Sequence, residues 1–375
     1  MAQPIPLYLP FVDDTDLDSL RAALRPLAAG ASVRTLEQRV AELARRPFGV
    51  AAGSPGGGLE IALRALGIGA GDEVIVPSLG AVEAADAVVR THATPVFADV
   101  DPRSLSLTAE IADRLVTDRT RAVLAFTMLG DAGSLEALAR LCTKHEVPLV
   151  EDASDAIGAT VGGEPVGRFG RIAIFSMTDD RVVPAAGATV LVTHDDRLAA
   201  QCRRYRDGGS AESAASLERV GVDSPLDDLR AAIAANRLRR LDAAIEARRR
   251  LADLYLRHLA GQTELILPAP RGDGGGCWPR FCVRLSDQFT RFDRDEILAG
   301  MRRHEIAASE GPLAVPTLPR HGHRIGHASG SYPVSERASD RAICLPFYEG
   351  LSEREVELVA ATLELMISRN SFRRE

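Results

Sequence analysis

Lysine is almost absent from this chain of 375 residues. Lysine and arginine together number 45, and Lys144 is the only lysine among them. A GC-rich genome, which favours arginine and alanine codons, would explain this bias. Whatever its origin, a mechanism that needs a lysine amine from this chain has to use Lys144 or do without one.

Long apolar runs and a disulfide pattern are also missing. No stretch approaches eighteen consecutive apolar residues, so we expect no membrane-spanning helix. Residues 1–4 lack the basic and apolar regions of a secretory signal. The five cysteines are an odd number without a C-x-x-C pair, which predicts reduced thiols in a cytoplasmic protein. A net charge of −7, with cations spread along the chain, argues against a nucleic-acid-binding protein.

Strand and helix patterns alternate over the first two-thirds of the chain. Strands are predicted at 73–76, 95–98, 121–126, 147–150, 172–175 and 189–192, with helices at 82–90, 109–115 and 135–144. This order is typical of an α/β fold with a mostly parallel sheet covered by helices on both faces. A long helix is expected at 226–259, followed by a smaller α+β domain. We therefore expect a large domain over residues 1–250 and a small one over 251–375.

Several segments resemble the nucleotide-sugar aminotransferases of the DegT/StrS family. The similar segments are 61–77, 93–102, 150–153, 175–176, 228–233 and 345–346. The resemblance covers nearly the whole chain in order. It implies aminotransferase fold type I, with a mostly parallel seven-stranded sheet, in a homodimer whose active site lies at the subunit interface. Enzymes of this fold type use pyridoxal phosphate (PLP).

The resemblance breaks at the lysine that bonds covalently to PLP. In the family this lysine follows the Phe-Ser pair, and here the aligned residue is Arg181. A guanidinium stays protonated and cannot form a Schiff base. Lys144 is no substitute, because it ends a helix that precedes a strand, on the outer side of the sheet.

Other positions that contact PLP in the family also differ. The phosphate-binding turn corresponds to Pro55, Gly56 and Gly57, and the aromatic residue that stacks on the ring corresponds to Ala81. The differences extend to Asp155, Ile157, Asp223 and Pro225. Asp152 remains where a carboxylate would pair with the pyridine nitrogen, and Ser176 where a hydroxyl would touch the phosphate. These changes together lead us to expect no cofactor.

Acidic residues gather at the predicted pocket instead. Glu83, Asp152, Asp155, Asp179, Asp180 and Arg181 all follow or flank predicted strands. Clustered carboxylates raise one another's pKa, whereas a guanidinium lowers the pKa of a neighbouring carboxylate. Two carboxylates whose pKa values are shifted apart in this way can act as general acid and general base. We therefore expect Asp152, Asp155, Arg181 and Glu83 to catalyse PLP-independent cyclisation, dehydration or isomerisation of a sugar-like or polyketide-like molecule. Alternatively, Asp152 bonds backbone at a strand end, and Asp179 and Asp180 are solvated turn residues.

For the histidines and arginines outside this cluster, we expect a solvent-exposed position rather than a role in catalysis. His321 and His323, with His327, lie in a Gly-rich stretch near family substrate contacts, and a solvent-exposed loop is the simpler interpretation. Neither they nor the carboxylates show a spacing that specifies a metal, so none is expected. The run of arginines at 248–250 is expected on a solvated helix face.

Two other functions remain open. The chain could be a non-catalytic partner or scaffold for a true aminotransferase. It could also be an aminotransferase or dehydratase that holds PLP, or its amine form pyridoxamine phosphate (PMP), without a covalent bond.

Overall fold

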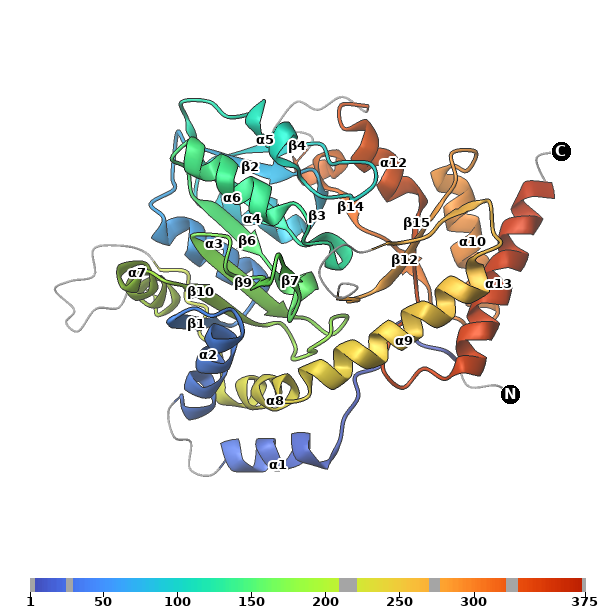
Figure 1. Cartoon of the computed structure of the whole chain (residues 1–375), viewed down its shortest axis with the longest axis horizontal. Helices are drawn as coiled ribbons and strands as arrows, with labels where there is room; N and C mark the ends of the chain where they lie inside the picture. The colour runs from blue at the N-terminus through green and yellow to red at the C-terminus, as the bar shows by residue number, and fades with distance from the viewer. Residues whose placement is uncertain (1–3, 25–29, 209–220, 270–276, 322–329, 373–375) are drawn as a thin grey trace.

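The computed structural model describes residues 4–24, 30–208, 221–269, 277–321 and 330–372. A seven-stranded sheet forms its larger part, with the strand order β1-β10-β9-β6-β5-β2-β4 (Figure 1). The strands are β1 (Phe48–Ala52), β2 (Glu73–Pro77), β4 (Thr94–Ala98), β5 (Thr120–Phe126), β6 (Leu149–Asp152), β9 (Ile172–Met177) and β10 (Ala188–Thr193). Neighbours from β9 to β4 pair in parallel, whereas β10 pairs antiparallel with β9 and β1. The predicted mostly parallel sheet is confirmed.

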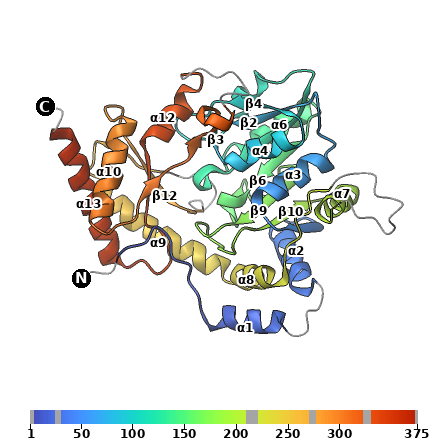
Figure 2. The ribbon, with the colours of Figure 1, turned by 180° about the vertical axis from the view of Figure 1, so that it is seen from behind.

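Helices cover both faces of this sheet, and a separate apolar core lies under each layer. One core joins α2 (Ala31–Leu43), α6 (Leu135–Lys144) and α8 (Asp228–Leu238) to strand residues such as Ile75. The other joins α3 (Pro55–Ala65), α4 (Val82–Arg90) and α7 (Asp196–Arg206) to residues such as Val74. Figure 1 shows α6 in front of the sheet, and Figure 2 shows α3 and α4 in front of its other face. Alternate strand residues therefore face opposite cores, as burial on both sides requires.

The predicted long helix is in fact two. Between α8 and α9 (Leu241–Leu259), the N–H groups of Arg239 and Arg240 donate to carbonyls three residues earlier. Arg240 also pairs with Asp13, the N-cap of α1 (Asp14–Ala23), and with Asp16 in the first turn of that helix. These ion pairs connect segments far apart in the sequence, and no glycine or proline marks the break.

The C-terminal part forms a four-stranded sheet with the order β11-β12-β15-β13. Its strands are β11 (Leu265–Ile266), β12 (Phe281–Leu285), β13 (Ser309–Glu310) and β15 (Ala342–Leu345). A third core packs this sheet against α9, α10 (Arg291–Arg303) and α13 (Glu353–Phe372). The boundary predicted after residue 250 lies inside α9 and stays a prediction.

Short elements connect the two sheets or flank them. The strand β14 (Leu313–Ala314) pairs with β3 (Leu79–Gly80), which brings the C-terminal part beside the end of β2. The remaining elements are α5 (Ala109–Asp113), α12 (Pro333–Arg341), β7 (Thr160–Val161), β8 (Glu164–Pro165), and the 3-10 turns η1 (Met128–Gly130), η2 (Ser154–Ala156) and η4 (Val315–Thr317). All five cysteines are buried free thiols. No helix within the described ranges is long and apolar enough to cross a membrane.

Candidate active site

A cavity of about 310 Å³ lies at the carboxyl ends of the central strands. Its walls come from the ends of β5, β6 and β9, from the start of α3 and α4, and from residues 311–313 of the C-terminal part. The lining residues with polar or charged side chains are Glu83, Thr127, Asp152, Asp155, Ser176, Thr178, Asp180, Arg181 and Arg280. Most of the carboxylates predicted from sequence therefore do meet at one site, as expected for the ligand edge of such a sheet.

Asp152 ends β6 and is buried in the cavity wall, with 8% of its surface exposed. Its Oδ1 accepts hydrogen bonds from the backbone N–H of Ser154, at 3.1 Å, and from the Ser154 hydroxyl. Among the described residues, its Oδ2 has no hydrogen-bond donor. Burial raises the pKa of Asp152, and the nearby Arg181 only partly offsets this effect. This carboxylate would gain from a cationic partner.

Asp155, in contrast to Asp152, is surrounded by cationic groups. Its Oδ1 lies 2.9 Å from Arg181 Nη1, although the contact lacks hydrogen-bond alignment. Its Oδ2 accepts hydrogen bonds from Arg280 Nη2, at 2.9 Å, and from the Leu129 N–H, at 3.1 Å. Burial works to raise the pKa of Asp155, but Arg181 and Arg280 together hold it below its usual value. The two neighbouring carboxylates are therefore shifted in opposite directions.

Arg280 was not anticipated from the sequence. It precedes β12 and bridges two carboxylates that follow strands of the large sheet, reaching Asp155 after β6 at 2.9 Å and Asp180 after β9 at 3.1 Å. Asp180 in turn accepts a hydrogen bond from the Thr178 hydroxyl at 2.7 Å. No local pattern distinguishes Arg280 from the many other arginines, because its partners lie 100 or more residues away in the chain.

Arg248 corrects a second expectation, since this arginine is buried rather than solvated. It donates to the carbonyls of Pro279, at 2.7 Å, and Arg181, at 3.0 Å. Its guanidinium also lies over the ring of Phe347, 5.5 Å from the centroid. Arg248 thereby fixes the backbone of both segments that carry the arginines bound to Asp155.

Ser176 lines the cavity and is buried. Its oxygen accepts a hydrogen bond from Thr189 at 3.2 Å, which leaves its own hydroxyl proton free to donate. Gly56 and Gly57 lie in the first turn of α3, where the Ser54 hydroxyl accepts from the Gly57 N–H at 3.1 Å. Neither glycine lines the cavity, whereas the preceding Pro55 does.

The other predicted site residues have different surroundings. Glu83 is exposed in the first turn of α4 and lines the cavity, and no ion pair to it occurs among the described residues. Asp179 is exposed, lies outside this cavity and accepts from the Ala186 N–H at 3.2 Å. His321 is buried beside Asp86, at 3.1 Å, and the ring of Phe97. It therefore belongs neither to an exposed loop nor to the cavity, whereas His323 lies outside the described residues.

Lys144 cannot serve this cavity from its own chain. It ends α6, before β6 begins, so it lies at the opposite edge of the sheet from Asp152. Its side chain is 65% exposed and pairs with Asp113 at 3.3 Å. Since Lys144 is the chain's only lysine, no lysine amine reaches the cavity. In the described part of the chain no cluster of three or more potential metal ligands occurs either.

The family assignment follows from comparison with known proteins. Residues 11–364 match the model of the DegT/DnrJ/EryC1/StrS aminotransferase family. This chain belongs to that family.

Relatives and solved structures agree with the assignment. A UDP-N-acetyl-3-dehydro-alpha-D-glucosamine 3-aminotransferase of Acidithiobacillus ferrooxidans is 32% identical over 333 residues, which cover 88% of this chain and 87% of that protein. The structure of S. venezuelae DesV in complex with a ketimine intermediate is 30% identical, with a TM-score of 0.85 over 96% of this chain and 99% of that one. The structure of Spr1654 from Streptococcus pneumoniae in its PMP form reaches a TM-score of 0.90 at 19% identity, over 98% of this chain and 100% of that one, and it supports the fold alone.

These comparisons overturn the expectation that the chain takes no cofactor. The chain belongs to an aminotransferase family, and the DesV structure at 30% identity holds a ketimine intermediate, which points to PLP. The PLP-independent interpretation falls with that expectation. It rested only on residue differences from the family at positions such as Ala81 and Arg181.

The cavity fits this cofactor at two of its three attachment points. The buried Asp152 carboxylate, with no donor on Oδ2 in the described structure, suits a protonated pyridine nitrogen. The Ser176 hydroxyl suits the phosphate group. The third attachment point, a lysine amine, has no counterpart within the cavity.

Proposed function

We propose that this chain holds PLP or PMP without a covalent bond and acts on a small sugar-like substrate in a homodimer. The observation that carries the proposal is Asp152, a buried carboxylate on the cavity wall whose pKa is raised by burial. The substrate class rests on the aminotransferase relative that is named for a UDP-linked keto sugar. When bound, the cofactor supplies an electron-accepting ring next to the reacting carbon.

The residues of the cavity would bind the cofactor and determine the charge around it. Asp152 would bind the ring nitrogen and Ser176 the phosphate. Arg181 keeps its positive charge but offers no nucleophile, because a guanidinium is not deprotonated in proteins. Held by Asp155 at 2.9 Å, it forms a charged wall of the cavity.

Glu83 is the carboxylate best suited to proton transfer at the substrate. Asp155 and Asp180 are tied to Arg181 or Arg280 in ion pairs. Asp152 is assigned to the cofactor ring. Among the acidic lining residues, only Asp152 and Glu83 have no ion pair in the described structure. With Asp152 assigned to the ring nitrogen, Glu83 is the carboxylate left to take up and return a proton.

Calorimetric titration with PMP tests the proposal. PMP carries no aldehyde, so its binding does not depend on a lysine. We expect saturable binding by the wild type, weakened about 30-fold or more in Asp152→Asn, because a buried charge pair loses one partner. Glu83→Gln should bind PMP normally while losing turnover of a sugar substrate. Absence of PMP binding, or equal affinity in Asp152→Asn, would overturn the proposal.

A second candidate is a non-catalytic subunit that pairs with a lysine-containing relative. The position of Lys144, at the far edge of the sheet, favours this alternative. Native mass spectrometry separates the two: a homodimer that binds PMP supports the first function. A monomer that binds no PMP and associates only with such a relative supports the second.

A further inference from the structure

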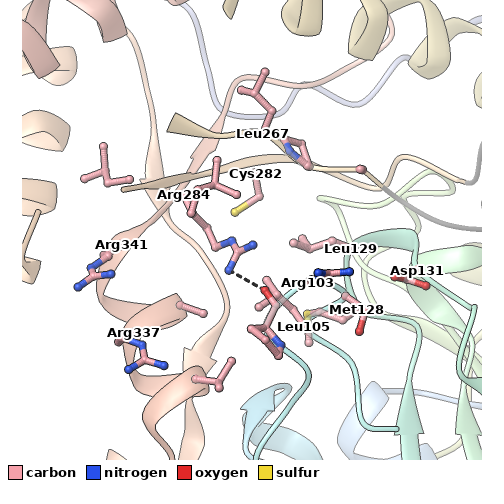
Figure 3. A pocket seen from close by; sticks show the side chains of 18 of the residues that line it. Arg103, Leu105, Met128, Leu129, Asp131, Leu267, Cys282, Arg284, Arg337 and Arg341 are labelled. Atoms are coloured by element: carbon pink, nitrogen blue, oxygen red, sulfur yellow. Dashed lines mark hydrogen bonds between the residues drawn. The ribbon is translucent and has the colours of Figure 1, made fainter. Parts of the chain in front are cut away.

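A second cavity, of about 480 Å³, lies between the large sheet and the C-terminal part of the chain. Four arginines line it: Arg103, Arg284, Arg337 and Arg341. Figure 3 shows Arg284 between Arg337 and Arg341 on one side and Arg103 on the other. They come from the segment after β4, from β12 and from α12, so the folded structure rather than the local sequence gathers them.

Two of these guanidinium groups are fixed by neighbouring backbone. Arg284 Nη1 donates to the Pro102 carbonyl at 3.2 Å (Figure 3). Arg341 Nε donates to the Phe289 carbonyl at 2.8 Å, and its Nη1 pairs with Asp287. Carbonyl partners hold a guanidinium in place without neutralising its charge. The orientation is therefore set before any ligand arrives, which lowers the entropic cost of binding.

The positive charge of this cavity is not balanced by the protein. Its lining contains two carboxylates, Asp131 and Asp287, against the four arginines. Asp287 is already paired with Arg341. In the part of the chain that the structure describes, Arg103, Arg284 and Arg337 form no ion pair. Burial lowers the pKa of Arg284, so an anion close to it would relieve an existing desolvation cost.

Apolar side chains form the rest of the wall. Leu105, Met128, Leu129, Leu267 and Cys282 line the cavity around the arginines (Figure 3). A cavity of this size, with mostly apolar walls and a few convergent charged groups, is typical of sites for small organic molecules. Arginine forks match the oxygen geometry of phosphate groups.

We propose that this cavity binds a small organic phosphate ester, with its phosphate on the arginines and its apolar body on the leucine wall. The site is distinct from the one that holds Asp152. The turn η1 lies between them, and Met128 is the one residue that lines both cavities. The inference goes beyond the proposed function, and it does not depend on PLP binding.

Calorimetry with phenyl phosphate and inorganic phosphate, both at low salt and without added cofactor, tests this site. We expect phenyl phosphate to bind more tightly than inorganic phosphate, because only the ester reaches the apolar wall. The double variant Arg103→Gln/Arg337→Gln should weaken phenyl phosphate binding tenfold or more, since charged hydrogen bonds are lost. Both arginines are exposed, so the fold should survive their replacement.

Two controls locate the ligand. Arg140→Gln removes an exposed arginine of α6 that pairs with Glu136 away from both cavities, and it should leave binding unchanged. Asp152→Asn should also leave it unchanged. Failure of phenyl phosphate to bind at millimolar concentration, or unaltered affinity in the double variant, would overturn the proposal. So would loss of phenyl phosphate binding in Ser176→Ala, because the phosphate would then lie in the Asp152 cavity. Equal affinity for phenyl phosphate and inorganic phosphate would show that the apolar wall contributes nothing to binding, and it would overturn the assignment of an organic ligand.

Discussion

Arg181 lies 2.9 Å from Asp155, where the family resemblance places its PLP-bonding lysine. Arg280 binds the same carboxylate from the C-terminal part, also at 2.9 Å. Two guanidinium groups therefore lie beside a buried acid, and they lower the pKa of Asp155. This arrangement keeps the cavity polar and connects two parts of the chain without providing a nucleophile.

Returning a lysine to this position should restore covalent attachment. In Arg181→Lys the amine would enter a cavity wall that already suits PLP at Asp152 and Ser176. We expect this variant, treated with PLP and borohydride, to gain a stoichiometric increase in intact mass, which peptide mapping assigns to residue 181. Arg171→Lys is the matched control, because Arg171 is 51% exposed and pairs with Asp195 instead. An unmodified residue 181 would contradict the assignment of this position.

Removal of the Asp155 carboxylate should destabilise the fold. Asp155→Asn leaves Arg181 and Arg280, whose side chains are only 16% and 29% exposed, without their shared partner. A loss of about 3 kcal/mol in the free energy of unfolding is expected, measured by urea denaturation. The exposed Asp179→Asn should lose less than about 1 kcal/mol. Comparable losses in both variants would show that the buried ion pairs do not stabilise the protein.

The same carboxylate gives the stability a defined pH dependence. Because its folded pKa is lowered, its contribution is complete above the unfolded value near 3.8 and is lost as the pH falls through the folded value. The difference in unfolding free energy between wild type and Asp155→Asn should therefore shrink only below about pH 4. A difference that already shrinks between pH 7 and 5 would contradict the lowered pKa.

Asp152 should behave in the opposite way in the cofactor-free protein. Its raised pKa means that ionisation disfavours the folded state, so its stabilising contribution is present below about pH 4 and lost as the pH rises through the folded value. Asp152→Asn without cofactor is expected to melt at a higher temperature than wild type at pH 7, and this advantage should narrow towards pH 4. Thermal unfolding measures both. A lower melting temperature at pH 7 would indicate that Asp152 is satisfied within the protein.

Arg248 should be required for the geometry of the arginine pair. Arg248→Gln leaves the Pro279 and Arg181 carbonyls without their donor, and we expect a loss of about 2–4 kcal/mol in the free energy of unfolding. Arg248→Lys should rescue only part of this loss, because an ammonium lacks the planar fork. The neighbouring exposed Arg250→Gln serves as the control in the same urea titrations. Equal stability of all three variants would contradict the positioning role.

The sequence was sufficient to predict the fold and to predict that residues at the strand ends gather beside one another. Regular alternation of strands and helices, together with the family segments, predicted the sheet, and strand ends led to Asp152, Asp155 and Ser176. These predictions rest on local periodicity and on the resemblance to the family, both of which are visible in the sequence. The break between α8 and α9 was missed because it depends on ion pairs between Arg240 and the distant Asp13 and Asp16.

The electrostatics of the site could not be read from residue types alone. Asp152 and Asp155 are three positions apart, yet only the structure shows that Arg280 and Arg181 neutralise one of them and not the other. The buried Arg248 was expected on a solvated face, because charge is a poor guide when the partners are backbone carbonyls. The cofactor expectation failed for a related reason: absent contacts were visible in the sequence, whereas the environment of the retained Asp152 was not.

The most direct test of the account combines cofactor retention with chemical trapping. The wild-type protein is incubated with PLP, desalted, and divided into portions with and without borohydride before intact-mass analysis. We predict that the cofactor's absorbance remains with the native protein, whereas the denatured polypeptide keeps its unmodified mass in both portions. A stoichiometric mass increase after borohydride would contradict non-covalent binding, and loss of all PLP on desalting, together with no binding in titration, would contradict a cofactor site at Asp152.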